Sequence, residues 1–117
     1  MATTELQAIV RFRFHDGDVE EFKRLSARCM EIVRTQDTGT LQYDTYFNDD
    51  ETECIVIERF RDSEALIQHS ENLAHLMDAI TATGSVLGKL LGEPSAELRA
   101  RFTGGGPVEL FTPWVTM

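Results

Sequence analysis

The sequence predicts an α+β fold in which helices cover one face of an antiparallel sheet. Two kinds of hydrophobic period alternate along the chain. Apolar residues recur at every second position in the segments expected to be strands, and at three- and four-residue steps in those expected to be helices. The predicted order is strand, helix, strand, strand, helix, strand, followed by a short helix and a last strand. The first six elements have the order of a ferredoxin-like plait.

The first strand and the first helix follow directly from these periods. In LQAIVRFRF, residues 6–14, apolar side chains alternate with others, as in a half-buried strand. The sequence HDGD then supplies a turn and a helix N-cap at Asp18. Glu20 and Glu21 lie in the first turn of the next periodic segment, where the helix dipole favours acids. We therefore expect a helix over residues 18–36.

Two strands joined by a short connection are expected next, over residues 40–48 and 52–61. A connection over residues 49–52 would pair Tyr43 with Glu58 across the hairpin. One face of the hairpin is then apolar apart from one acid, and carries Leu41, Tyr43, Thr45, Phe47, Cys54, Val56, Glu58 and Phe60. The other face is mixed, and carries Gln42, Asp44, Tyr46, Ile55, Ile57, Arg59 and Arg61.

The second helix is expected over residues 62–84, with Asp62 or Ser63 as its N-cap. Its apolar stripe consists of Leu66, His69, Leu73, Leu76, Met77 and Ile80. His69 therefore faces the sheet, whereas His75 lies off the stripe and is expected at the surface. The elements expected after this helix are a strand over 85–92, a short helix over 93–102 and an edge strand over 107–114.

Length and charge narrow the class of protein. The 117 residues suit a single domain, with a core over about residues 6–92 and a C-terminal extension over 93–117. The net charge of −9 argues against nucleic acid and against an anionic membrane surface as partners. The N-terminus lacks the pattern of a signal peptide, and no apolar run approaches the roughly 18 residues of a membrane span. Two cysteines make no disulfide framework, so a cytoplasmic location is expected.

The second face of the predicted sheet suggests a partner. Tyr46, Ile55 and Ile57 lie there beside several arginines. This surface is too mixed for the core of a monomer and too apolar for bare water, and a patch of that kind usually marks an interface. The sequence therefore predicts a homodimer.

The segment TGTLQYDTYFNDDETECIVIERFRDSEALIQHSENLAH resembles the antibiotic-biosynthesis monooxygenase (ABM) domain family, which includes quinol monooxygenase-like proteins. The residues that carry the resemblance are Gly39, Leu41, Tyr43, Glu58, Arg59, Phe60, Asp62, His69 and His75. The resemblance covers roughly residues 6–92. It implies a dimeric α+β barrel in which two sheets pack face to face, with a pocket in each subunit. The chain departs from the family at Phe60, where Trp is common, and in its longer segment after Gly92.

The resemblance also implies an activity. Some members of the family oxygenate quinols, anthrones or other phenolic small molecules without metal or flavin, with O₂ as co-substrate. This chemistry is feasible without a cofactor, because a phenolate or enolate can itself give an electron to O₂. The protein then supplies proton removal, orientation and a dry cavity.

His69 and Glu58 are the candidate catalytic residues. His69 can accept a proton from a phenolic substrate, because its ordinary pKa is about 6.5, and Glu58 can hold it in one tautomer. The alternative is a structural pair, with Glu58 satisfied by Tyr43, by an arginine or by the partner chain. The expected substrate-binding residues are Tyr43, Phe60, Leu66 and Leu73. No metal site is expected, because His69 and His75 lie on different faces of the helix and no second cluster of ligands follows.

Two other classes of function remain open on the sequence alone. An isomerase of a small hydroxyketone needs the same acid and base but no oxygen. A non-catalytic small-ligand-binding or stress-response dimer needs the pair only as structure. Oxygen uptake with a quinol separates the monooxygenase from both.

Overall fold

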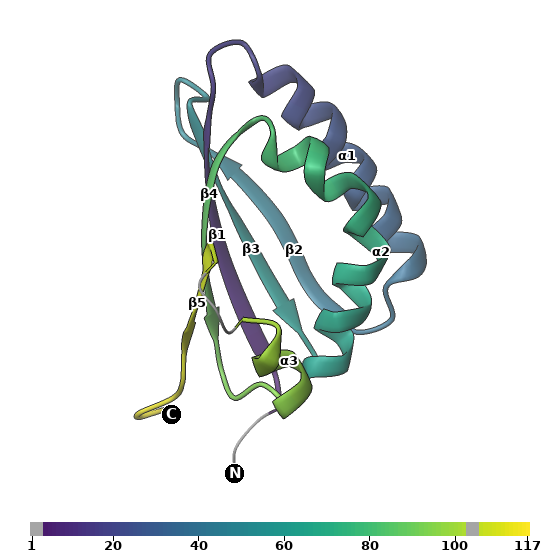
Figure 1. Cartoon of the computed structure of the whole chain (residues 1–117), viewed down its shortest axis with the longest axis vertical. Coiled ribbons are helices and arrows are strands. Elements are labelled where there is room, and N and C mark those ends of the chain that lie inside the picture. The colour runs from purple at the N-terminus through teal and green to yellow at the C-terminus, as the bar shows by residue number, and fades with distance from the viewer. Residues whose placement is uncertain (1–3, 103–105) are drawn as a thin grey trace.

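The computed structural model describes residues 4–102 and 106–117 and contains a five-stranded sheet in the order β2-β3-β1-β4-β5 (Figure 1). Helices α1 and α2 cover one face of this sheet. The elements are β1 (Leu6–Phe14), α1 (Val19–Gln36), β2 (Thr40–Phe47), β3 (Glu53–Phe60), α2 (Ser63–Thr81), β4 (Gly84–Leu91), α3 (Ala96–Ala100) and β5 (Val108–Phe111). The order β2-β3-β1-β4, antiparallel throughout, confirms the predicted ferredoxin-like plait.

The predicted register of the β2–β3 hairpin is confirmed, because Tyr43 pairs with Glu58 and Phe47 pairs with Cys54. The assignment of Leu41 to the inner face is wrong. The register shifts between Thr40 and Gln42, as at a β-bulge, and Leu41 is 47% exposed. A bulge adds one residue to a strand and so breaks the strict alternation from which the face was predicted.

The caps of the two long helices differ from one another. Asp62 caps α2 as predicted, because its carboxylate accepts a hydrogen bond of 2.9 Å from the backbone N–H of Ala65. Asp18 occupies the N-cap position of α1, but its side chain makes no capping hydrogen bond. The backbone N–H of Phe22 instead bonds the carbonyl oxygen of Asp18, at 3.1 Å.

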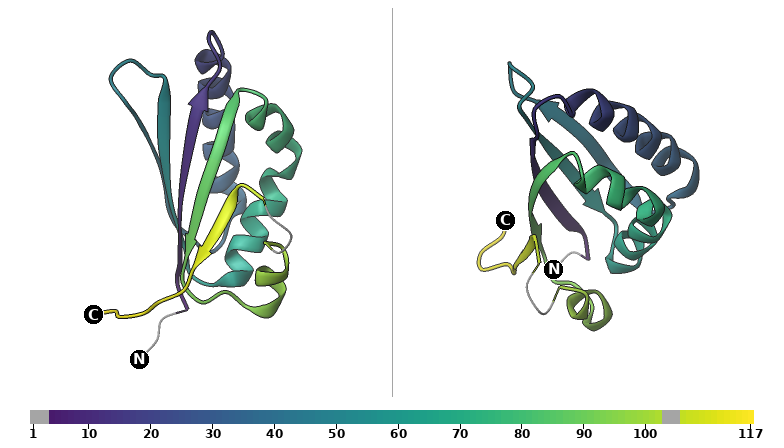
Figure 2. Two further views of the ribbon diagram at one scale, coloured as in Figure 1. Left: turned by 60° about the vertical axis from the view of Figure 1, so that its left-hand side comes forward. Right: turned by 45° about the horizontal axis from the view of Figure 1, so that its top comes forward.

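The C-terminal segment extends the plait. Ser95 caps α3, accepting a hydrogen bond of 3.2 Å from the backbone N–H of Leu98. Strand β5 is shorter than expected and pairs with β4 in parallel, so the sheet is mixed at this edge. Figure 2 shows β5 beside β4, with the last residues running away from the body of the fold. Trp114 is in that tail and is 95% exposed.

The core lies between the sheet and the helices, in two clusters. The α1 cluster contains Phe12, Phe22, Leu25, Cys29, Ile32, Val33, Cys54, Val56, Leu73, Leu76 and Ile80. The α3 cluster contains Leu6, Phe60, Ala65, Leu66, Ile67, Leu90 and Leu98. Burial of such side chains supplies most of the driving force for folding.

No helix of the described residues covers the outer face of the sheet (Figures 1 and 2). Tyr46 and Leu87 are 57% and 68% exposed there, and Ile55 and Ile57 are half-buried. Among the residues that the structure describes, no helix has the length and apolar character needed to cross a membrane.

Close contact between β1 and β4 makes Gly84 a sensitive position. A Cβ atom there would lie 2.0 Å from the carbonyl oxygen of Arg13, which is backbone and cannot move aside. We predict that Gly84→Ala lowers the free energy of unfolding by about 2 kcal/mol or more, on the scale of overpacked sites. Gly106→Ala is the control, because nothing lies within 4 Å of its Cβ position. Equal urea midpoints for the two variants would contradict the prediction.

Candidate active site

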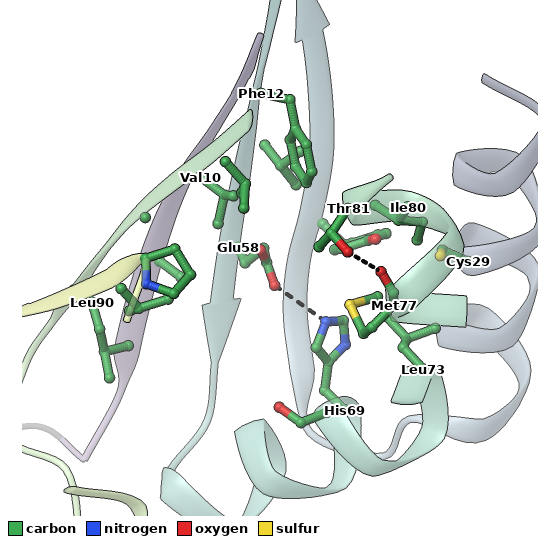
Figure 3. A pocket seen from close by; sticks show the side chains of 18 of the residues that line it. Val10, Phe12, Cys29, Glu58, His69, Leu73, Met77, Ile80, Thr81 and Leu90 are labelled. Atoms are coloured by element: carbon green, nitrogen blue, oxygen red, sulfur yellow. Dashed lines mark hydrogen bonds and ion pairs between the residues drawn. The ribbon is translucent and has the colours of Figure 1, made fainter. Parts of the chain in front are cut away.

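Strand β3 and helix α2 bring Glu58 and His69 together (Figure 3). The alternation of β3 turns Glu58 inward between Val56 and Phe60, and the apolar stripe of α2 turns His69 toward the sheet. The distance from His69 Nε2 to Glu58 Oε1 is 3.2 Å. His69 is 7% exposed, so the sequence-based prediction that it faces inward beside Glu58 is confirmed. His75 is exposed, as predicted.

A third residue, Asp37, completes the group. It follows the last residue of α1, and its carboxylate lies 2.7 Å from His69 Nδ1. The same carboxylate accepts hydrogen bonds from Thr40 Oγ1 at 2.7 Å and from Asn72 Nδ2 at 2.8 Å. The side chain of Asp37 is 1% exposed. The end of α1, the start of β2 and helix α2 therefore meet at one buried carboxylate.

Both nitrogens of the His69 ring face carboxylates, at Asp37 and at Glu58. An ionised carboxylate only accepts hydrogen bonds, so a ring that carries a proton on each nitrogen satisfies both partners. The ring is then an imidazolium between two carboxylates. Asp37, which was not predicted, holds Nδ1, and Glu58 faces Nε2.

The pKa shifts agree with this arrangement. Burial by itself lowers the pKa of His69, but the hydrogen bonds and charges of Glu58 and Asp37 outweigh it and raise the pKa above its ordinary value. Burial likewise opposes ionisation of Asp37, but its bonds from Thr40, Asn72 and His69 lower its pKa overall. Both shifts favour the charged states of the two groups.

Tyr43 and Phe60 flank the ring of His69. Their ring centroids lie 5.3 Å and 5.0 Å from that of His69. Burial raises the pKa of Tyr43 far above its ordinary value, and the neighbouring Cys29 and Glu58 raise it further. Burial also raises the pKa of Cys29. Tyr43 is therefore a neutral phenol at physiological pH, and Cys29 is an unreactive thiol.

A cavity of about 310 Å³ opens beside the Glu58–His69 pair. All six residues predicted for the site line it: Tyr43, Glu58, Phe60, Leu66, His69 and Leu73. Ala8 and Gly88 also line it, and their small size leaves the space open. These two residues were not predicted, because a small side chain in a strand has no period that distinguishes a cavity from a core.

Other residues of the family pattern shape the fold or lie on its surface. A Cβ atom at Gly39 would lie 2.5 Å from the Cβ of Ala65, so β2 and α2 can approach each other only with glycine there. Asp62 caps α2, and Arg59 lies on the outer face beside Glu5, at 3.6 Å. Within residues 4–102 and 106–117, no three His, Cys, Asp or Glu side chains are arranged to hold a metal ion.

Residues 6–80 match the sequence pattern of the family described as antibiotic biosynthesis monooxygenase. The chain belongs to this family. No curated protein matches the ABM chain at significant similarity.

Solved structures share the fold. MupZ from Pseudomonas fluorescens superposes with a TM-score of 0.79 at 20% identity, over 100% of this chain and 91% of its own. Rv0793 from Mycobacterium tuberculosis has a TM-score of 0.68 at 21% identity, over 78% and 96%. SnoaB from Streptomyces nogalater, a cofactor-independent oxygenase, has a TM-score of 0.63 at 21% identity, over 75% and 91%. Identities of this size show a common fold alone.

The charged His69 makes stability depend on pH. Its pKa in the folded state lies above the ordinary 6.5, so the folded chain binds this proton more tightly than the unfolded chain does. That contribution is fully present below the ordinary pKa and is lost as pH rises through the folded pKa. We predict that the free energy of unfolding in urea falls as pH rises from about 6 to 8.

Two variants test the origin of this slope. His69→Gln should abolish it, whereas His75→Gln, at an exposed position of the same helix, should keep it. An unchanged slope in His69→Gln would assign the pH dependence to other groups.

Proposed function

We propose that this ABM chain is a cofactor-independent monooxygenase that acts on a phenolic small molecule such as a quinol or an anthrone. The observation that carries the proposal is the buried Glu58–His69 pair in the wall of a largely apolar cavity, with Asp37 on the far side of the His69 ring. The membership of this chain in the ABM family and the oxygenase activity stated for SnoaB support the same class of reaction.

The geometry suggests how the roles are divided. Both ring N–H groups of His69 are already engaged, so we give the first proton transfer to Glu58 rather than to His69. The Glu58 carboxylate takes the proton of the phenol or enol. His69 then turns its Nε2–H from Glu58 to the new substrate oxyanion, while Asp37 holds Nδ1. A preorganised cationic donor in a dry site stabilises such an anion strongly.

The remaining chemistry lies in the substrate. The anion gives an electron to O₂, and the two radicals combine at carbon. For an anthrone, the CH₂ group becomes a carbonyl and the second oxygen atom leaves as water, so the substrate supplies all the electrons. The apolar lining around the pair excludes water from this step.

Substitutions at the group test its roles. We predict that Glu58→Gln and His69→Gln each lower turnover of an anthrone by about 10²-fold or more, the scale of a lost acid or base. Turnover is measured as O₂ consumption in an oxygen electrode. His75→Gln is the matched control on the surface of α2 and should keep the wild-type rate. Variants with wild-type turnover and only a lower melting temperature would make the group structural.

A second candidate is an isomerase of a small hydroxyketone. The specific observation in its favour is the juxtaposition of a carboxylate and an imidazolium at 3.2 Å. Glu58 would remove the proton next to the carbonyl, and His69 would donate to the carbonyl oxygen. Turnover in the absence of O₂ identifies this reaction. Ligand binding with no turnover in air or under nitrogen would support the non-catalytic alternative.

We also propose a homodimer formed through the outer face of the sheet, with the two sheets facing one another. Tyr46, Ile55, Ile57 and Leu87 give this face its apolar character. The salt bridge between Arg11 and Glu53, at 2.6 Å, neutralises part of its charge.

Neighbouring residues of β3 separate assembly from folding. Val56 is buried in the α1 cluster, whereas Ile57 faces outward and is half-buried. We predict that Ile57→Asp gives a folded monomer, while Val56→Asp unfolds the chain, because a buried unpaired charge is expensive. Sedimentation gives the mass and circular dichroism gives the fold. A wild-type chain that sediments as a monomer would refute the dimer.

A further inference from the structure

The Glu58–His69 pair lies between two apolar parts of the cavity wall. Val56, Glu58 and Phe60 are successive inward positions of β3, and all three line the cavity. Val56 belongs to the α1 cluster and Phe60 belongs to the α3 cluster. A ligand that reaches Glu58 therefore meets apolar surface on both sides of it.

The C-terminal segment builds part of this wall. Phe102, Pro107 and Val108 line the cavity, and we call these three residues the C-terminal wall. Phe102 and Val108 pack against the α3 cluster. Val108 also faces Gly88, where a Cβ atom would lie 3.3 Å from Val108 Cγ2. Because Val108 lines the cavity, a larger side chain at this position would narrow it.

The segment is attached to the rest of the fold at both ends. Leu98 of α3 is 1% exposed within the α3 cluster. The backbone N–H of Ser95 donates to Ser63 Oγ at 2.8 Å, and the backbone N–H of Gly88 donates to the carbonyl oxygen of Pro107 at 2.7 Å. The C-terminal wall is thus fixed in place by the core and by β4.

Exposed lining residues mark the mouth of the cavity. Ser70, Met77 and Thr81 line it from one face of α2 and are exposed. Pro107 lines it from the C-terminal wall and is exposed as well. The opening therefore lies between α2 and the C-terminal wall, so this wall borders the route by which a ligand enters.

The C-terminal wall lies outside the part of the chain that matches the family pattern, which ends at residue 80. Rv0793 and SnoaB superpose over nearly all of their own lengths but over only 78% and 75% of this chain. A quarter of this chain is thus additional to those folds, whereas MupZ spans all of it.

We propose that the C-terminal wall is the specificity-determining element of the cavity, and that it selects an uncharged, elongated ligand whose polar group lies between two apolar parts. Phe102 and Val108 contact the apolar part that extends away from Glu58 toward the mouth. The Glu58 carboxylate would repel an anionic ligand, and any charged ligand would lose its hydration in this largely apolar cavity. The inference rests on the proposed function for the reaction at Glu58, but it concerns binding.

Binding of Nile red, an uncharged polycyclic dye that fluoresces in apolar surroundings, tests the proposal without any turnover. Val108→Trp should weaken binding about tenfold or more, because it fills the wall side of the cavity. Glu109→Trp is the matched control, since the neighbouring residue of β5 is exposed and pairs with Lys89. Ala8 is the cross-strand partner of Glu58 and lines the cavity. Ala8→Leu should therefore also weaken binding, and that loss would place the dye in this cavity.

A second variant works in the opposite direction. Phe102→Ala enlarges the cavity. The affinity for Nile red should therefore rise severalfold relative to the affinity for naphthol, a smaller ring compound. Equal dye affinity in folded Val108→Trp and in wild type would overturn the proposal. If Val108→Trp does not fold, an unchanged affinity ratio in Phe102→Ala overturns it instead. Absence of O₂ consumption would refute the proposed monooxygenase and leave these binding results intact.

Discussion

The imidazolium of His69, bound between Asp37 and Glu58, connects parts of the chain that are distant in sequence. Asp37 ends α1, Glu58 belongs to β3, and His69 belongs to α2. Removing three charges from water is costly, and the cost is offset only when the geometry is good and the remaining polar atoms are satisfied. Asp37 meets this condition with bonds from Thr40 and Asn72. A single unsatisfied member would leave a buried charge alone, so the group is retained or lost as a unit.

Alternation along strands made much of this site predictable. The hairpin register placed Tyr43 opposite Glu58, and the stripe of α2 turned His69 inward, because both inferences need only local periods. Asp37 was not predicted. It lies 32 residues before His69, in a segment that the sequence marks only as a helix end. Nothing local shows that the C-terminal end of α1 lies beside the first half of α2. The face of Leu41 was predicted wrongly for a different reason. A bulge turns this residue to the other face without leaving any sign in the amino-acid composition.

The cavity reflects a balance between packing and function. Larger side chains at Ala8 and Gly88 would fill the space under α2 and would bury more apolar surface. The chain instead keeps small residues on the neighbouring strands β1 and β4, and the C-terminal wall borders the opening. Stability that the core could have gained is exchanged for room beside Glu58 and His69.

The position of Trp114 gives the protein an internal optical reporter. It is the one tryptophan in the chain, and it is 95% exposed in the tail that runs past the sheet. Its emission therefore carries no signal from the cavity or from either core cluster in the isolated chain. A shift of that emission to shorter wavelength, with the fold unchanged, would report the arrival of another surface against the C-terminal tail.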